Sequence, residues 1–282
     1  MATASLRKVH SDTATKNRAK PFLKWVGGKT QLLPHILDLF PKNFNRYHEP
    51  FVGGGAVFFS LEPKKAILSD VNPDLIGAYQ MIRDDVDSVI AELKQHRAEE
   101  AYYYSVREAD VAELSAAEAA ARIIYLNKTC FNGLYRVNRR GKFNVPFGKY
   151  VNPTICNEAN LRAVSEALQG VDIRLQSVFE LNSRVKKNDL VYFDPPYVPL
   201  SPTASFTSYT KQGFGEHQQR ELAALFGKLV NKGAHCFLSN SDTPLVRELY
   251  KDFRIKKVYA RRAINSRADR RGPVGEVIVC SN

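Results

Sequence analysis

The apolar positions of this chain fall into short blocks that alternate with longer stretches of helical spacing. After about residue 20, runs of four to six apolar residues have the length and composition of buried strands. Between them, Leu, Ile and Phe recur every three or four residues, which is typical of amphipathic helices. The expected strands are 66–70, 173–177, 189–194, 234–240, 255–260 and 276–281, and the clearest helices are 30–40, 216–233 and 243–253. Strands that alternate with helices predict an α/β fold built on a parallel sheet.

The segment Tyr47–Leu61 predicts a ligand-binding turn. Its sequence YHEPFVGGGAVFFSL reads as a short strand, a glycine turn and the start of a helix. Glycines at such a turn let the backbone approach a ligand closely, and the helix that follows presents its positive end. Asp70 ends the next strand, where an acid suits a pair of ribose hydroxyls. The alternative is a plain tight turn, with Asp70 capping the helix that begins after Asn72-Pro73.

The middle of the chain has a different character. Residues 74–125 are helical by composition, and LYRVN, RRGK and FNVPFG at 134–148 predict a β-hairpin. We therefore expect an α/β domain formed by residues 20–73 and 161–282, interrupted by an inserted helical domain with a hairpin at 74–160. Residues 1–19 are basic and have few apolar anchors, which predicts a disordered tail. A transit peptide is the weaker interpretation, because the segment lacks an apolar helical face.

The composition of the chain restricts which classes of protein it can belong to. The chain has 282 residues, of which 44% are hydrophobic, and no run approaches the roughly 20 apolar residues that span a bilayer. The four cysteines are widely scattered and form no metal-ligand pattern, so free thiols in a reducing cytoplasm and no metal site are expected. The formal net charge of +12 favours a polyanionic partner, with ordinary solubility as the alternative.

The positive charge is concentrated in two segments. Residues 122–150 contain seven Lys or Arg, no Asp or Glu, and six aromatic residues. Residues 254–271 contain eight Lys or Arg against one acid. Solvated faces also carry such runs, but basic side chains among aromatic rings favour nucleic acid. Within the expected hairpin, Arg136, Arg139, Arg140 and Lys142 are placed to reach phosphates or base edges.

The stretch DLVYFDPPY at 189–197 predicts the reactive site. Asp194 follows a strand at its carboxyl end, where open α/β sheets bind ligands. Pro195 and Pro196 stiffen the chain and, lacking N–H groups, present only carbonyl acceptors. Together with the Asp194 carboxylate and the ring of Tyr197, they suit a planar ring that carries an amino group. The alternative is a loop merely stiffened by proline.

Seven motifs, in order along the chain, resemble those of the DNA adenine-N6 methyltransferases of the α group, the Dam and DpnII-type enzymes acting at GATC. The motifs are PFLKWVGGK (21–29), EPFVGGGAVF (49–58), LSDVNPDLI (68–76), FNGLYRVNRRGKFNVPFGKY (131–150), VYFDPPY (191–197), FTSYT (206–210) and LSNSD (238–242). The resemblance implies a class I S-adenosylmethionine-dependent methyltransferase fold with a Rossmann-like mixed sheet and an inserted, mostly helical target-recognition domain.

The resemblance also implies roles for individual residues. The catalytic corner is Asp194, Pro195, Pro196 and Tyr197. The positions for S-adenosylmethionine, which leaves as S-adenosylhomocysteine, are Trp25, Lys29, Phe51, Gly53, Gly55, Asp70 and Asp194. The positions for double-stranded DNA are Lys24, Phe131, Asn132, Leu134, Arg136, Asn138, Arg139, Pro146 and Tyr150. An adenine swung out of the duplex would be methylated on its exocyclic nitrogen, and Phe131 would fill space near the vacated position.

Several alternatives remain at this point. Cytosine-N4 methylation needs a similar corner, although the residue before Pro-Pro-Tyr is more often Ser in that class. RNA methylation and a DNA-binding module without catalysis also stay open, whereas a nicotinamide dehydrogenase is disfavoured by the glycine spacing. We expect a cytoplasmic, nucleoid-associated protein of bacterial or phage type, with no membrane contact and no obligatory protein partner. The sequence leaves open whether the enzyme acts alone or within a restriction-modification pair.

Overall fold

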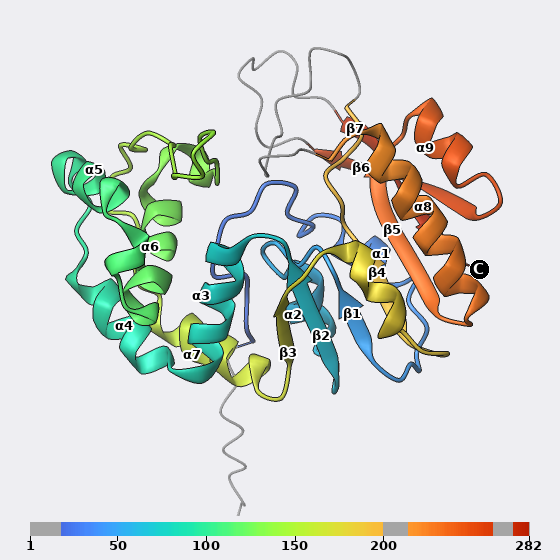
Figure 1. Cartoon of the computed structure of the whole chain (residues 1–282), viewed down its shortest axis with the longest axis horizontal. Helices are drawn as coiled ribbons and strands as arrows, with labels where there is room; N and C mark the ends of the chain where they lie inside the picture. Colours follow the sequence, from blue (N-terminus) through green and yellow to red (C-terminus); the bar gives the residue numbers. More distant parts are fainter. Residues whose placement is uncertain (1–17, 200–213, 262–272, 282) are drawn as a thin grey trace, which may run out of the picture.

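A seven-stranded mixed sheet forms the centre of the α/β part of the molecule. The computed structural model describes residues 18–199, 214–261 and 273–281 (Figure 1). The strands are β1 (Tyr47–Glu49), β2 (Ala66–Asp70), β3 (Asp172–Leu175), β4 (Leu190–Phe193), β5 (His235–Ser241), β6 (Arg254–Arg261) and β7 (Pro273–Cys280). They lie in the order β3-β2-β1-β4-β5-β7-β6. The first five are parallel to one another, and β7 runs antiparallel to both β5 and β6.

The strand order reverses between β1 and β4. From β1 the chain builds outward through β2 to β3, and it then returns to place β4 on the other side of β1. Connections leave such a switch point in opposite directions, so a crevice opens at the carboxyl ends of the two strands. Glu49 ends β1 and Asp194 follows β4, so the topology brings the glycine turn and the proline corner to the same edge.

Helices cover the sheet and form a separate group beside it. They are α1 (Leu33–Leu37), α2 (Ala56–Leu61), α3 (Pro73–Asp84), α4 (Val86–Gln95), α5 (Glu100–Glu108), α6 (Ala116–Thr129), α7 (Glu158–Leu168), α8 (Glu216–Asn231) and α9 (Pro244–Leu249). Short 3-10 turns occur at η1 (Val111–Glu113), η2 (Phe131–Gly133) and η3 (Val178–Ser183). In Figure 1 the group α4–α6 stands to one side of the sheet, opposite α8 and α9. None of these helices is long and apolar enough to cross a membrane.

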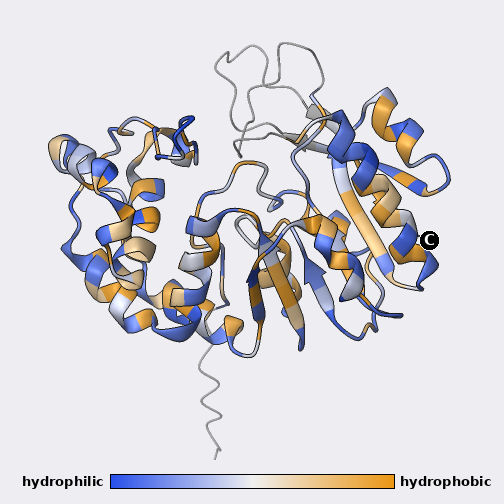
Figure 2. Ribbon diagram, viewed as in Figure 1, coloured by the Kyte–Doolittle hydropathy of each residue, from blue (hydrophilic) through white to orange (hydrophobic). Residues whose placement is uncertain are grey.

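Side-chain alternation along β4 explains why helices pack on both faces of the sheet. Leu190 and Tyr192 belong to one buried cluster, which extends through α2 and α3 into α6. Val191 and Phe193 point the other way, into a second cluster with α8 and β7. All four are fully buried, as expected for a central parallel strand covered on both sides. Figure 2 shows the same distribution, with hydrophobic colour concentrated where helices meet strands.

The inserted helices begin and end at recognisable signals. Ser115 and Glu118 form a capping box at the start of α6, which satisfies two otherwise free N–H groups. Arg122, counted in the sequence among the basic residues facing nucleic acid, is instead buried. Its guanidinium donates to the carbonyls of Val106 and Arg107 at the end of α5. This arginine therefore joins two helices, and it is not part of a surface charge.

The hairpin expected at 134–148 is present in position, but it is not a regular ladder. It is joined by the isolated bridge Val137↔Phe143, and a second bridge links Cys130 to Phe147. The turn is closed by the Asn138 side chain, whose Oδ1 accepts from the N–H groups of Arg140 and Lys142. Asn138 thus has a structural role in the turn, which the resemblance to DNA-contacting positions did not indicate.

The other predicted elements are confirmed with small shifts in their ends, and the α/β fold is as expected. The predicted tail ends earlier than residue 19: Arg18 forms a 2.7 Å ion pair with Glu62, and Ala19 is buried against the body. The motif at 206–210 and the side chains of Arg261, Arg262, Arg267, Arg270 and Arg271 lie outside the described residues. The division into domains at 73/74 and 160/161 stays a prediction.

Candidate active site

The glycine turn after β1 is built around a buried carboxylate. Glu49 is 3% exposed, and its Oε2 accepts from the Tyr47 hydroxyl at 2.9 Å and from the Phe58 N–H at 3.2 Å. Burial raises the pKa of Glu49 to about 8. The carboxyl group therefore ties the end of β1 to the first turn of α2, which holds the intervening glycines in place.

Two of the glycines are required by conformation and by contact. Gly53 has φ of 47° and Gly55 has φ of 69°, in the left-handed region that favours glycine. A Cβ at Gly53 would lie 2.7 Å from Cδ1 of Trp25, and one at Gly55 would lie 2.6 Å from the Tyr79 hydroxyl. The Tyr79 hydroxyl in turn donates to the Gly53 carbonyl at 3.1 Å. Trp25 thus lies directly on the glycine turn, as its predicted role requires.

Asp70 lies at the carboxyl end of the neighbouring strand. Its two oxygens accept from the N–H groups of Gly53 and Asn72 at 3.3 and 3.1 Å. Burial raises its pKa to about 6, partly offset by these hydrogen bonds. The alternative that Asp70 caps α3 is wrong, because the side chain of Asn72 accepts from the Leu75 N–H and forms the cap. Asp70 therefore lies beside the glycine turn, and each of its oxygens accepts one backbone hydrogen bond there.

Apolar surface is exposed along the same edge of the sheet. Val71, Leu175 and Phe179 are respectively 47%, 57% and 37% exposed; Val71 follows β2, Leu175 ends β3 and Phe179 lies in η3. Phe179 also stacks parallel to Phe214, which meets Phe51 edge to face. An acid at the end of β2 beside exposed apolar groups and a glycine turn matches the polar ribose and planar base of a nucleoside. The residues present therefore fit an adenosyl cofactor.

The proline corner after β4 holds the second carboxylate of the site. Asp194 Oδ1 lies 2.7 Å from the Nζ of Lys29, and the two side chains are 21% and 6% exposed. Burial raises the pKa of Asp194, and the Lys29 ammonium opposes that shift. Lys29 comes from the segment between the glycines at 27–28 and α1, far from β4 in sequence. The ion pair therefore connects the segment before α1 to the proline corner after β4.

Tyr197 is oriented by two partners. Its hydroxyl donates to Oε2 of Glu276 on β7 at 2.8 Å. The Lys29 ammonium lies over its ring, 4.8 Å from the ring centre. The Glu276 carboxylate also raises the pKa of Asp194 through its negative charge. An antiparallel strand at the end of the chain thus sets the position of the aromatic ring in the corner.

A buried amide pair supports the backbone of the corner. The Nε2 of Gln219 on α8 donates to the Pro196 carbonyl at 2.8 Å, and its Oε1 accepts from Nδ2 of Asn240 at 3.1 Å. Asn240 Oδ1 then accepts from the Val198 N–H at 3.0 Å. The Pro196 carbonyl is therefore occupied within the protein. This leaves the Asp194 carboxylate and the Pro195 carbonyl as acceptors for a ligand.

The amino-terminal segment and the η2 turn before the hairpin meet through a buried amide. Asn127 on α6 is 1% exposed and exchanges hydrogen bonds with the backbone N–H and carbonyl of Lys24 at 2.7 and 2.8 Å. Its amide also donates to the Gly133 carbonyl at 3.0 Å. The Lys24 ammonium lies 4.8 Å from the centre of the Tyr150 ring. The structure thus brings together Lys24 and Tyr150, which lie far apart in sequence.

The other residues predicted to bind DNA lie in the hairpin or directly before it. Phe131 is 51% exposed, and its N–H donates to the Pro146 carbonyl at 2.8 Å. Asn132 is exposed with φ of 57°, and Leu134 is half-buried. Arg136 and Arg139 are exposed along the hairpin.

Tyr135 connects the hairpin to Trp25 and to the first turn of α3. Its ring stacks on Trp25 with centroids 5.2 Å apart and meets Phe143 of the hairpin edge to face. Its hydroxyl donates to Asp74 Oδ2 at 2.9 Å, in the first turn of α3. Tyr135, which precedes Arg136 in the chain, therefore contacts Trp25, and Trp25 lies on the glycine turn.

The family described as D12 class N6 adenine-specific DNA methyltransferase matches residues 25–264. The chain belongs to this family. It is 44% identical to the Type II methyltransferase M1.LlaDCHI of Lactococcus lactis subsp. cremoris, over 94% of this chain and 96% of that protein. It is 46% identical to the Type II methyltransferase M.MjaIII of Methanocaldococcus jannaschii, over 89% and 95%. It is 38% identical to the DNA adenine methylase of Escherichia coli, over 93% and 95%.

Membership in the D12 class decides between the alternatives that the sequence left open. The protein is an enzyme, an adenine-specific DNA methyltransferase, so the cytosine, dehydrogenase and purely DNA-binding interpretations are set aside. Its fold is that of class I S-adenosylmethionine-dependent methyltransferases, and family and fold together imply use of that cofactor. Among the described residues, no group of three or more His, Cys, Asp and Glu side chains is arranged to hold a metal ion.

Sequence reasoning missed several residues of this D12-class site. Glu276 lies in the last strand and carries no local motif, so only the strand order reveals its contact with Tyr197. Gln219 and Asn240 are buried amides in an amphipathic helix and a strand, and buried polar side chains in such positions are a usable signal. Asn127 and Phe179 had no signal beyond their proximity to quoted motifs.

Proposed function

We propose that this methyltransferase acts on an adenine extruded from double-stranded DNA within GATC, using the residues assembled at the ends of β1, β2 and β4. The observation that carries the proposal is the corner formed by Asp194, its ion pair with Lys29 at 2.7 Å, and the oriented ring of Tyr197. A carboxylate, a free backbone carbonyl and an aromatic face converge there. Together they suit the amino group and the plane of one base.

The cofactor would lie along the edge between the glycine turn and Phe179. Asp70 would accept from the ribose hydroxyls, while Trp25 and the Gly53 backbone cover the other end. S-adenosylmethionine, when bound, supplies an electrophilic methyl group, so the protein's task is mainly positioning and electrostatics. Phe51 supports this edge of the sheet through its edge-to-face contact with Phe214.

The target amino group would be held by two acceptors. The Asp194 carboxylate and the Pro195 carbonyl accept its two hydrogens, while the base stacks on Tyr197. Each such stacking contact contributes about 1–3 kcal/mol, which offsets the few kcal/mol required to unstack the base from the duplex. The nitrogen lone pair is delocalised into the purine ring. Acceptors placed out of the ring plane favour a more tetrahedral nitrogen, whose lone pair is available for attack.

Lys29 keeps the Asp194 carboxylate ionised. Burial alone would favour the protonated acid, which accepts hydrogen bonds less well. The ammonium at 2.7 Å lowers the pKa of Asp194 relative to that of the same site without it. The charge of the site is thus set within the protein before DNA arrives.

The recognition surface would hold the duplex while the base is out. We assign Lys24, Asn132, Leu134, Arg139, Pro146 and Tyr150 to DNA contacts, with Phe131 filling space near the vacated position. The exposure of Phe131 and the pairing of Lys24 with Tyr150 support these roles. Arg136 is chemically suited to a guanine, because arginine donates to O6 and N7 together. The GATC target itself follows from the resemblance to Dam and DpnII-type enzymes.

The test is methylation of defined duplexes with S-adenosylmethionine. Mass spectrometry of the digested product should show 6-methyladenine in a GATC duplex and little in duplexes with one base pair of the site replaced. A matched RNA duplex should remain unmodified. Protein that binds the cofactor yet methylates altered sites as fast as GATC would refute the assigned target.

A further inference from the structure

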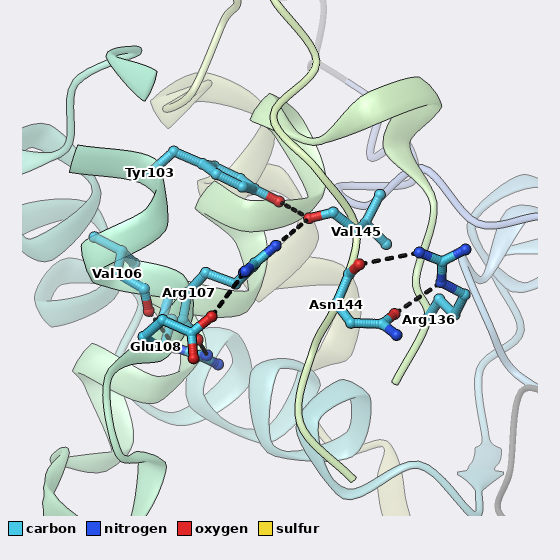
Figure 3. Close-up of polar contacts among 8 residues, drawn as sticks. Tyr103, Val106, Arg107, Glu108, Arg136, Asn144 and Val145 are labelled. Atoms are coloured by element: carbon cyan, nitrogen blue, oxygen red, sulfur yellow. Dashed lines mark hydrogen bonds and ion pairs between the residues drawn. The ribbon is translucent and has the colours of Figure 1, made fainter. Parts of the chain in front are cut away.

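Arg136 is held by a single residue across the hairpin. Its Nε donates to Asn144 Oδ1 at 2.7 Å, and its Nη2 donates to the Asn144 carbonyl at 3.0 Å. The backbone carbonyl of Arg136 in turn accepts from the Asn144 N–H at 3.0 Å. Figure 3 shows the two side-chain contacts, with Asn144 directly opposite the guanidinium. Three hydrogen bonds between the same two residues leave the arginine little freedom at its inner edge.

Asn144 is itself placed by its two neighbours. Phe143 and Val145 are buried at 5% and 1% exposure, so the chain enters and leaves Asn144 through packed positions. The Val145 carbonyl accepts from the Tyr103 hydroxyl at 2.7 Å and from the Arg107 guanidinium at 3.5 Å, both on α5 (Figure 3). Asn144 is therefore anchored to the helical group through its neighbours.

The contacts leave a defined set of donors for a ligand. A guanidinium has five N–H groups arranged in a plane. Asn144 takes the Nε–H and one Nη2 hydrogen, which together form one side of that plane. The outer edge, formed by Nη1 and Nη2, keeps a parallel pair of donors. That edge matches the O6 and N7 acceptors of guanine in the major groove. No Asp or Glu among the described residues forms an ion pair with Arg136 to compete for these donors.

We propose that Asn144 is a specificity-determining positioning residue, which holds the inner side of Arg136 so that its outer edge reads one guanine of the target. This inference rests on the proposed function, because it assumes that the hairpin reads a GATC site. An asparagine suits the task, since its neutral oxygen directs the arginine without neutralising it. The competing role for Asn144 is a direct contact of its amide with a phosphate, which would contribute equally to every sequence.

The experiment measures methylation rates on normal GATC duplexes and on duplexes in which each guanine in turn is 7-deazaguanine, which lacks the N7 acceptor. In the wild-type protein, the loss of one hydrogen bond at the guanine read by Arg136 should lower kcat/KM roughly 3- to 10-fold. We compare the ratio of kcat/KM on the normal duplex to kcat/KM on the 7-deazaguanine duplex. In Asn144→Ala this ratio should approach one, and kcat/KM on the normal duplex should be lower than in the wild-type protein. Asn144→Asp retains an acceptor at the same place and should restore the wild-type ratio, while its negative charge should lower kcat/KM on every duplex to the same extent.

Lys142→Ala serves as the matched control. Lys142 is an exposed basic residue of the same hairpin, and its side chain does not touch Arg136. Its removal should lower kcat/KM on all duplexes alike. The ratio between the normal and the 7-deazaguanine duplex should stay at the wild-type value. Cofactor affinity and thermal unfolding of Asn144→Ala should match wild type, because its backbone hydrogen bond and both buried neighbours remain.

Two results would overturn the inference. If Asn144→Ala keeps the wild-type ratio, the arginine does not depend on it. If Asn144→Ala and Asn144→Asp both lower activity on every duplex equally, Asn144 contacts phosphate. In either case a wild-type preference for GATC would leave the proposed function standing. A wild-type protein with no preference for GATC over altered sites would overturn the function and the inference together.

Discussion

Lys29 and Asp194 form a 2.7 Å ion pair although one lies before α1 and the other follows β4. The pair is largely shielded from solvent, and the ammonium also lies over the ring of Tyr197. Attraction between opposite charges is stronger where water is scarce. Burial raises the pKa of Asp194, and the residue that opposes this shift lies far from it in the sequence.

Replacing Lys29 by Met should move the acid limb of the pH profile to higher pH. Burial raises the pKa of Asp194 and Lys29 lowers it, so loss of the ammonium lets the pKa rise further. The carboxylate is then protonated over a wider range, and activity is lost at a higher pH on acidification. Single-turnover rates between pH 5 and 9 with saturating cofactor measure the shift. Lys64→Met, at an exposed position before β2, should leave the profile unchanged.

Asp194→Ala should reduce methylation by at least roughly 10²-fold while DNA binding persists, because a charged acceptor for the reacting group is removed. Asp194→Asn keeps the shape and one acceptor oxygen, so its rate should lie between those of wild type and alanine. Rapid-quench rates and gel-shift affinities separate the two effects. Wild-type turnover in the alanine variant would contradict the role assigned to the carboxylate.

The contact between Tyr197 and Glu276 should contribute to the rate through the orientation of the ring. Hydrogen bonds to charged groups contribute about 1.5–3 kcal/mol, so Tyr197→Phe and Glu276→Ala should each lower kcat/KM for DNA roughly 10-fold. The double variant should be little worse than either single one, because both remove the same interaction. Fluorescence of 2-aminopurine at the target position would report a less ordered base. Additive losses would show that the two residues act independently.

Glu49→Gln should change how stability depends on pH. In the unfolded chain the Glu49 pKa lies at the ordinary value of 4.5, whereas burial raises it to about 8 in the folded protein. The folded state keeps a proton that the unfolded state releases, so the free energy of unfolding falls as pH rises between these values. The slope from this group is about 1.4 kcal/mol per pH unit.

The glutamine variant has no proton to release and should lack that contribution to the slope. Denaturant unfolding between pH 5 and 8 measures it. Glu113→Gln, at an exposed position in η1, is the control and should follow wild type. A slope that is identical in wild type and Glu49→Gln would mean that Glu49 is ionised throughout this range.

The strands and helices were largely predictable because their signals are local. Apolar runs placed β2, β4, β5 and β7 within a few residues, and the glycine turn before α2 was predicted from consecutive glycines after a short strand. The recognition hairpin was located correctly but was expected as a ladder. Pro146 lacks an N–H group and the side chain of Asn138 closes the turn, so only isolated bridges form.

The residues missed or misassigned share a different property. Arg122 reads as surface charge in the sequence, yet it is buried against carbonyls of α5. Asp70 was the alternative candidate for the α3 cap in the sequence, and only the structure shows that Asn72 fills that position. In both cases the outcome depends on which donors and acceptors face the side chain after folding.

The sequence by itself determined the fold class, the family and the chemistry at the carboxyl ends of β1 and β4. It could do so because glycine, proline and carboxylate impose local geometry or local charge wherever they occur. The tertiary structure alone decided which distant side chains act on that chemistry: Lys29 on Asp194, Glu276 on Tyr197 and Asn144 on Arg136. The physical reason is that hydrogen bonds and ion pairs act over a few ångströms of space, and strand order and helix packing decide which residues come within that reach.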